Sequence, residues 1–105
     1  MSETKELLQK ARALLASPEA WTQGVFARLA DGHSAYALDP AACAWCISGA
    51  IIKAHGSFPG PFEALYRMRK VIQASPDSLV DWNDAAGRTH AEVLAALDRA
   101  IESCP

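Results

Sequence analysis

Apolar side chains recur every three or four positions in several stretches of the chain, a spacing typical of amphipathic helices. The pattern predicts helices over about residues 3–16 and 62–74, and a last helix that begins at Thr89. Thr89 and Glu92 have the spacing of a capping box, in which each side chain bonds the other residue's backbone N–H. We expect the apolar stripe of this last helix to pack on the central helix of the domain: Val93, Leu94, Leu97, Ala100 and Ile101.

The stretch from Pro40 to Ile52 contains no charged residue. A helix that is apolar on all sides is buried in the protein, and at about 1.5 Å per residue this one is too short to cross a bilayer. Asp39-Pro40 provides a start signal and Gly56 a stop signal. The sequence therefore predicts a buried central helix over about residues 40–55, with neighbours on several sides.

Two smaller elements are predicted between the first helix and the central one. Ser17-Pro18 favours the start of a short helix that ends by Gly24. The helical period then disappears, and Asp31-Gly32 is a turn pair between two apolar runs, which predicts a β-hairpin over about residues 25–38. Because an isolated two-stranded ribbon is barely stable in water, this segment must lie against helices or else form an ordered loop.

Turn-forming residues separate the elements of the second half. Residues 57–61 are predicted to form a linker rich in turn residues. Ser75-Pro76-Asp77 is predicted to end the helix at about 62–74. A short piece at Leu79–Trp82 follows, and Gly87 breaks the backbone before the last helix. We therefore expect a mainly α fold: a bundle of four or five helices around the buried helix at about 40–55, with or without one small β-hairpin at about 25–38.

Composition narrows the classes of protein to which the chain could belong. Its 105 residues, half of them apolar and 21% charged, suit one hydrophobic core, so we expect a single domain over residues 1–105. A net charge of −2 makes nucleic acid an unlikely partner. The sequence shows no secretory signal and no apolar run long enough for a membrane span, and its three cysteines suit a reducing compartment. These features predict a cytoplasmic protein that does not bind membranes.

Cys43 and Cys46 form a C-x-x-C pair, which occurs in dithiol redox proteins and in zinc sites. A thioredoxin-like pair follows a buried strand, and none is predicted before Cys43. A zinc site would need two further ligands from Cys104, His33, His55 and His90, which have no close spacing. Buried cysteines that act as small apolar residues are the simpler interpretation. We therefore expect no metal and no cofactor.

One catalytic arrangement has the right residue types. Cys46 could act as a nucleophile, with His90 as its base and Asp84 or Asn83 to orient the ring. However, Cys46 lies in an uncharged run, and burial there would raise the pKa of its thiol and suppress the thiolate. The sequence does not settle whether the chain is an enzyme, and the lack of a convincing catalytic set favours a protein that is not.

The densest group of polar residues beside an aromatic one lies between positions 82 and 89. These side chains could bind a ligand or another chain: Trp82, Asn83, Asp84, Arg88 and Thr89. The alternative is architectural, because asparagine, aspartate and threonine also cap turns and helices. In that interpretation Arg88 pairs with Asp84 and fastens the last helix to the core.

Three short motifs together resemble a family of small bacterial and phage proteins of unknown function. They are W-x-x-G at Trp21 and Gly24, W-C-x-x-G-A at Trp45–Ala50, and N-D at Asn83-Asp84 with R-T at Arg88-Thr89. The resemblance spans about residues 20–101, implies one complete domain and supplies no activity. Cys43 lies outside the pattern, so Cys46 is the more informative cysteine. Gly49 and Ala50 are small, which predicts close approach of another helix there.

Together these observations favour a non-catalytic binding or regulatory module. Its partner would be an unknown protein or a small ligand, and a homodimer is compatible with the same residues. The alternative is a small cysteine-dependent enzyme that uses Cys46 with His90. A reactive thiolate below neutral pH would distinguish the enzyme from the binding module.

Overall fold

A computed structural model of the chain describes residues 3–57, 60–72 and 79–105. Within these ranges the chain forms five α-helices, one turn of 3₁₀ helix and three short strands, which confirms the predicted mainly α fold. In chain order they are α1 (Glu3–Leu14), η1 (Pro18–Ala20), β1 (Ala27–Arg28), β2 (Ser34–Ala35), β3 (Ala44–Trp45), α2 (Ile47–His55), α3 (Phe62–Ile72), α4 (Leu79–Asp84) and α5 (His90–Glu102).

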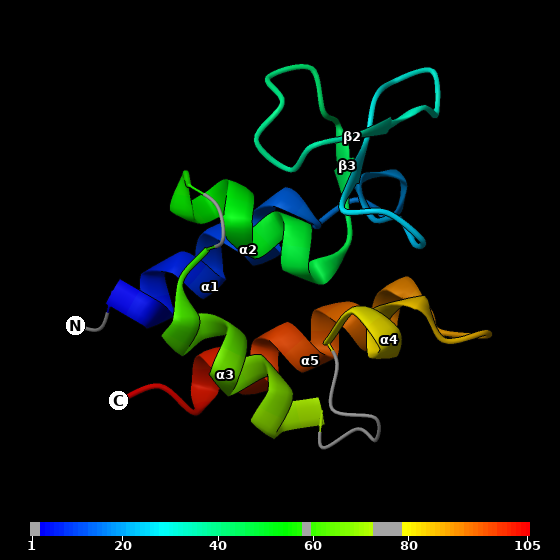
Figure 1. The fold of residues 1–105 in the computed structure, drawn as a ribbon. Coiled ribbons are helices and arrows are strands. Elements are labelled where there is room, and N and C mark those ends of the chain that lie inside the picture. Colours follow the sequence, from blue (N-terminus) through cyan, green and yellow to red (C-terminus); the bar gives the residue numbers. More distant parts are fainter. Residues whose placement is uncertain (1–2, 58–59, 73–78) are drawn as a thin grey trace.

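Helix α2 contacts α1, α3 and α4, and the small sheet stands at the end where α2 begins (Figure 1). Helix α1 lies along α2, α4 packs against α2 and α3, and α5 packs mainly against α1 and α3. The apolar stripe of α5 is buried in the shared core, where Val93, Leu97 and Ala100 have no exposed surface. Its main neighbours, however, are α1 and α3 and not the central helix.

The central helix is shorter than predicted. Helix α2 spans Ile47–His55, whereas residues 40–46 form a turn, the strand β3 and the helix cap. Asp39-Pro40 opens a turn, in which the Asp39 carboxylate accepts the N–H of Ala41 at 2.8 Å, and not a helix. The uncharged stretch is buried from Ala44 to Ile52, as expected, but Pro40, Ala41 and Cys43 at its start are exposed. Burial alone does not separate a strand from a helix.

The predicted hairpin is present and belongs to a three-stranded sheet. β1 pairs antiparallel with β2, with Ala27 opposite Ala35, and its other edge pairs with β3. The order β2-β1-β3 leaves β2 on the outside. Two contacts stabilise this short hairpin. β3 pairs with the edge of β1 that faces away from β2, and Ala27 is fully buried against the core.

The helix ends follow the sequence signals in part. The capping box of α5 is formed as predicted, with hydrogen bonds between Thr89 and Glu92 in both directions. The short helix near Ser17 is only the 3₁₀ turn η1, and the Ser17 side chain makes no capping bond, contrary to expectation. The predicted stop at residues 75–77 lies outside the described residues, as does part of the linker at 57–61.

The core joins every helix to the sheet. Its largest fully buried apolar side chains come from α1, α2, α3 and α5 and from the turn after α1: Leu8, Leu15, Ile47, Ile51, Met68, Val93 and Leu97. In the described ranges, the helices are all too short or too polar to cross a lipid bilayer.

Candidate functional site

The three sequence motifs meet at the side chain of Asn83, which is fully buried. Its Oδ1 accepts the indole N–H of Trp21 at 2.8 Å and the backbone N–H of Ile47 at 3.1 Å. Its Nδ2 donates to the carbonyl of Thr22 at 3.1 Å and to Asp84 at 2.9 Å. An amide side chain offers two donors and two acceptor positions, so Asn83 has its full set of partners. We call this cluster the Asn83 junction.

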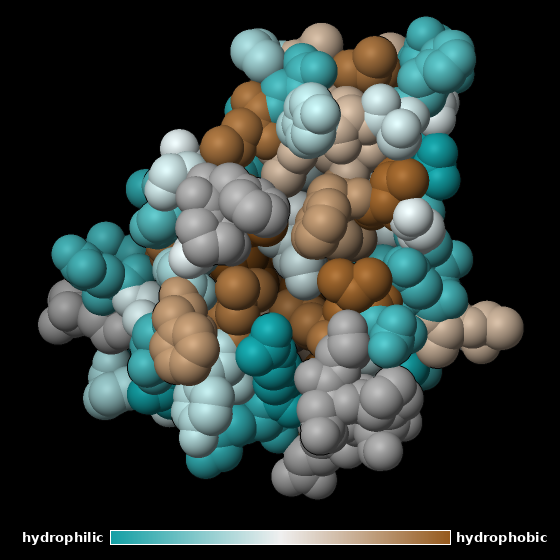
Figure 2. Space-filling model, in the orientation of Figure 1, coloured by the Kyte–Doolittle hydropathy of each residue, from teal (hydrophilic) through white to brown (hydrophobic). Residues whose placement is uncertain are grey.

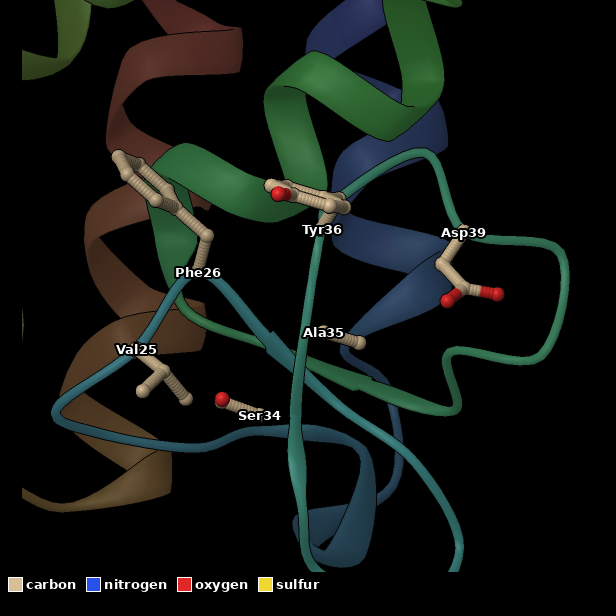
Figure 3. Close-up of a pocket in the computed structure, with 6 residues that line it drawn as sticks. All are labelled: Val25, Phe26, Ser34, Ala35, Tyr36 and Asp39. Carbon is tan, nitrogen blue, oxygen red and sulfur yellow. The ribbon is translucent and has the colours of Figure 1, made fainter.

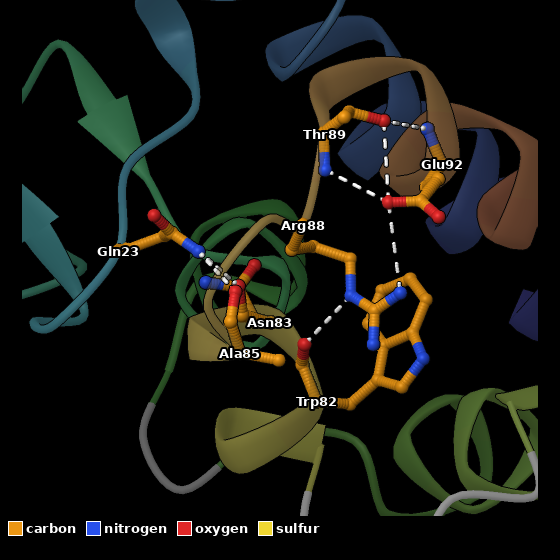
Figure 4. A network of polar contacts seen from close by, with 7 residues as sticks. All are labelled: Gln23, Trp82, Asn83, Ala85, Arg88, Thr89 and Glu92. Atoms are coloured by element: carbon orange, nitrogen blue, oxygen red, sulfur yellow. Dashed lines mark hydrogen bonds and ion pairs between the residues drawn. The ribbon is translucent and has the colours of Figure 1, made fainter.

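The segment that follows Trp21 is clamped to the end of α4. Asp84 Oδ1 accepts the backbone N–H of Gly24 at 3.0 Å. The side-chain amide of Gln23 donates to the carbonyls of Asn83 at 2.9 Å and Ala85 at 3.2 Å (Figure 4). Gly24 has φ +86°, a conformation that glycine adopts readily. The glycine and the aspartate of the motifs are thus parts of one structural contact.

Gly49 lies where backbone meets backbone. A Cβ atom at this position would overlap the carbonyl oxygen of Phe26. The close neighbour is therefore the chain just before β1, and the prediction of a neighbouring helix at Gly49 is wrong. A glycine is required here because no side chain fits between α2 and the sheet.

Cys46 is the N-cap of α2 and has a structural task. Its Sγ accepts the backbone N–H of Gly49 at 3.3 Å, and its side chain is buried. Burial raises the pKa of the Cys46 thiol, and the nearby Asp84 carboxylate acts in the same direction, while the Gly49 N–H opposes them. Cys46 was expected inside a helix, but it precedes the first helical residue.

The other potential ligands and bases lie apart. Cys43 is exposed, and Cys104 is buried near the C-terminus, just after α5. Among the described residues, no three histidine, cysteine, aspartate or glutamate side chains gather in a way that could hold a metal ion. His90 Nε2 lies 2.6 Å from the carbonyl oxygen of Leu15, which ties the start of α5 to the end of α1. Within the described residues no hydrogen bond joins His90 to Cys46.

In the segment from Trp82 to Thr89, the Arg88 side chain folds back onto Trp82. Arg88 donates from Nε to the carbonyl of Trp82 at 2.9 Å, and its guanidinium carbon lies 3.9 Å from the centre of the Trp82 ring (Figure 4). The ion-pair partner of Arg88 is Glu92, at 3.6 Å, and not Asp84 as predicted. The Trp82–Arg88 stack is therefore half-buried, Asn83 lies inside, and the exposed residues of the segment are Ala86, Gly87 and Thr89.

One surface pocket was missed by the sequence reasoning. A pocket of about 510 Å³ lies beside β2, and we call it the edge pocket: Val25, Phe26, Ser34, Ala35, Tyr36 and Asp39. The side chain of Tyr36 is 86% exposed and that of Phe26 is 42% exposed. Figure 3 shows both aromatic rings on the same side of the β2 strand. The hairpin register could have revealed this pair, because Ala27 opposite Ala35 places Phe26 opposite Tyr36.

A second, smaller hollow adjoins the edge pocket. It measures about 110 Å³, shares Val25 and Phe26 with the edge pocket, and is completed by Gly24, Cys46 and Val80. Val80 is 36% exposed, although it is aliphatic. Figure 2 shows hydrophobic side chains gathered in the middle of this face, between α2 and the pair α3 and α4. The two hollows thus adjoin through Val25 and Phe26, and the smaller one is lined mainly by apolar residues.

Comparison with known proteins identifies one family. The model of a family of unknown function (DUF6197) matches residues 1–103. No curated protein and no solved structure shows significant similarity to the chain.

Proposed function

The chain belongs to this family of unknown function, and we propose that it is a non-catalytic protein-binding module whose contact surface is the edge pocket. The observation that carries the proposal is the exposure of two aromatic side chains, Phe26 and Tyr36, at the rim of an open pocket. Aromatic side chains are enriched at protein interfaces and often dominate their binding energy. Exposed aromatic rings around one concavity mark a contact site more specifically than single exposed apolar residues do.

The arrangement of the candidate catalytic residues supports a binding role over an enzymatic one. A nucleophilic cysteine needs a base within hydrogen-bond reach and a lowered pKa. The pKa of Cys46 is raised, its sulfur caps α2, and one nitrogen of His90 is engaged by Leu15. Asp84 bonds Gly24 and Asn83. Each of these groups thus has a partner within the fold.

The predicted contact at residues 82–89 is a second candidate surface for the same function. The half-buried stack of Arg88 on Trp82 is its most distinctive accessible feature, because Asn83 is enclosed and Thr89 is engaged in the capping box. We favour the edge pocket since its aromatic side chains have few contacts to lose on binding. The Arg88–Trp82 stack, in contrast, is a cation–π contact within the folded chain, and a partner would have to break or cover it.

Selection from a displayed library of random peptides tests the proposal. Peptides that bind the wild-type domain should lose at least about 10-fold in affinity to Tyr36→Ala, which removes an interface aromatic. Phe62→Ala is the matched control, because Phe62 is also an exposed aromatic, 77% accessible, but lies on α3. Circular dichroism would verify that both variants fold.

Three outcomes contradict the proposal. One is a selection that yields no binding peptide, and another is a set of peptides that bind Tyr36→Ala as tightly as the wild type. The third is loss of binding in Arg88→Ala with full binding in Tyr36→Ala, which would move the contact to the Trp82–Arg88 stack.

A further inference from the structure

Strand β2 exposes a hydrogen-bonding edge. The backbone N–H of Leu29 donates to the carbonyl of His33 at 2.9 Å, so these two residues form a hydrogen-bonded pair of the hairpin. Pairs alternate along an antiparallel ladder between bonded and unbonded types. Ala27 and Ala35 are therefore the next bonded pair, and the N–H and carbonyl of Ser34 point away from β1.

These outward groups have no partner inside the described part of the chain. The sheet order places nothing beyond β2, and no hydrogen bond engages the N–H or the carbonyl of Ser34 or the N–H of Tyr36. The carbonyl of Tyr36 accepts the N–H of Asp39 in the following turn. Unpaired edge groups of this kind are a template to which an extended chain can pair.

The two sides of β2 differ in chemistry. Tyr36, Ser34 and the two residues before β1 lie toward one side of the strand, which is aromatic and apolar (Figure 3). Ala35 and Asp39 lie toward the other side. Asp39 Oδ1 accepts the N–H of Ala41, which leaves the second carboxylate oxygen available to a cation. Side chains of a strand alternate between its two sides.

We propose that the edge pocket receives an extended segment of a partner protein, which adds to β2 as a fourth strand and alternates apolar with basic side chains. This inference rests on the proposed binding function and specifies how the partner is recognised. The backbone of the added strand bonds Ser34 and Tyr36. Its apolar side chains pack on Phe26 and Tyr36, and its basic side chains face the Asp39 carboxylate.

Charge argues for a different protein and against a second copy of this chain. The edge pocket contains the Asp39 carboxylate, and the chain as a whole carries a net charge of −2. A second copy would bring further negative charge to this surface, whereas a basic segment is attracted to it.

The test uses a capped synthetic peptide that alternates valine with lysine, and two N-methylated forms of it. In one form the backbone nitrogens of the valines are methylated, and in the other form those of the lysines are methylated. Only one of the two sets can face β2, so we expect one form to lose about 10-fold or more in affinity while the other binds like the parent. Hydrogen exchange should show protection of the Ser34 and Tyr36 amides in the complex.

Charge is tested in the same titration. Asp39→Asn keeps the acceptor for Ala41 and should weaken binding of the lysine peptide by about 3-fold to 10-fold, whereas Glu102→Gln on α5 should leave it unchanged. A peptide that alternates valine with glutamate should bind far more weakly than the lysine peptide.

The results separate this inference from the proposed function. If both methylated forms bind like the parent peptide, or if the valine–lysine peptide does not bind at all, strand addition is overturned. The binding function would still stand if peptides from the library depend on Tyr36. A concentration-dependent dimer that Tyr36→Ala abolishes would also overturn the inference, in favour of a second copy on β2.

Discussion

The side-chain oxygen of Asn83 lies 3.1 Å from the backbone nitrogen of Ile47, the first residue of α2. The same oxygen accepts the indole N–H of Trp21. Asn83→Ala would remove the acceptor of the buried Ile47 N–H and of the half-buried Trp21 indole, and an unsatisfied buried group costs about 1–3 kcal/mol. We expect a loss of about 3 kcal/mol in the free energy of unfolding, measured by urea denaturation.

Two further variants define the cause of that loss. Asn83→Asp keeps the acceptor but places a negative charge beside Asp84, so it should also destabilise the protein at neutral pH. Gln9→Ala removes an exposed amide from α1 and should change the stability little. Wild-type stability in Asn83→Ala would show that the junction does not hold the fold.

Gly49→Ala tests the contact between α2 and the chain before β1. Because the added Cβ would overlap the Phe26 carbonyl oxygen, the backbone must shift, and we expect a loss of about 3 kcal/mol or more. Gly32→Ala is the control: its φ is +91°, but the space around it is open, so only about 1 kcal/mol of backbone strain is expected. Equal melting temperatures for the two variants would contradict the steric explanation.

Burial of Cys46 should appear as a dependence of stability on alkaline pH. The pKa of the Cys46 thiol is raised in the folded protein, mainly by burial. In the unfolded chain a cysteine thiol has a pKa of about 8.5. The contribution to stability is therefore complete below about pH 8.5 and is lost as the pH rises through the folded-state pKa. Cys46→Ser, whose hydroxyl can still cap α2, should flatten this decline in thermal denaturation.

Cys43→Ser is the matched control for the alkaline decline, since Cys43 is exposed. It should leave the pH dependence unchanged. Iodoacetamide should modify Cys43 in the native protein and spare Cys46. Rapid labelling of Cys46 below neutral pH would instead support the cysteine-dependent enzyme.

Arg88→Ala distinguishes an architectural Arg88 from a binding one. The side chain bonds the Trp82 carbonyl and stacks on the Trp82 ring, so its removal should cost about 1–2 kcal/mol and lower the melting temperature. Arg88→Lys should restore little, because lysine lacks the planar guanidinium. Unchanged stability in Arg88→Ala would favour a binding role for this residue.

Local signals predicted much of the fold. The periods of α1, α3 and α5 extend over three or more turns, and the Thr89–Glu92 box marks the start of α5. The Asp31-Gly32 pair correctly indicated the hairpin between β1 and β2. Each of these signals depends on residues close together in the sequence.

The error over residues 40–46 has a physical cause. Strand β3 contains two residues, Ala44 and Trp45, and so short a strand has no measurable alternation. An uncharged run indicates burial, which a strand and a helix share here. The boundary at Cys46 depends on the distant Asn83, whose side chain supplies an acceptor to the first turn of α2.

The candidate sites were less predictable than the helices. Asn83 and Asp84 stood out as polar residues, but no local pattern indicates that they bond Trp21 and Gly24, about sixty positions earlier. The edge pocket depends on which residues the sheet leaves uncovered. The strand order decides this, because it places β2 at an edge of the sheet with no strand of the described residues beyond it.

The Asn83 junction also bears on how the chain reaches its folded state. Its bonds join residues 36 and 62 positions apart, and closing such long loops costs conformational entropy before any of these bonds can form. Substitutions within the junction should therefore act mainly on the rate of unfolding, if it closes after the folding barrier. A chain cut between α2 and α4 would separate Ile47 from its acceptor, so we expect neither fragment to keep this region ordered without the other.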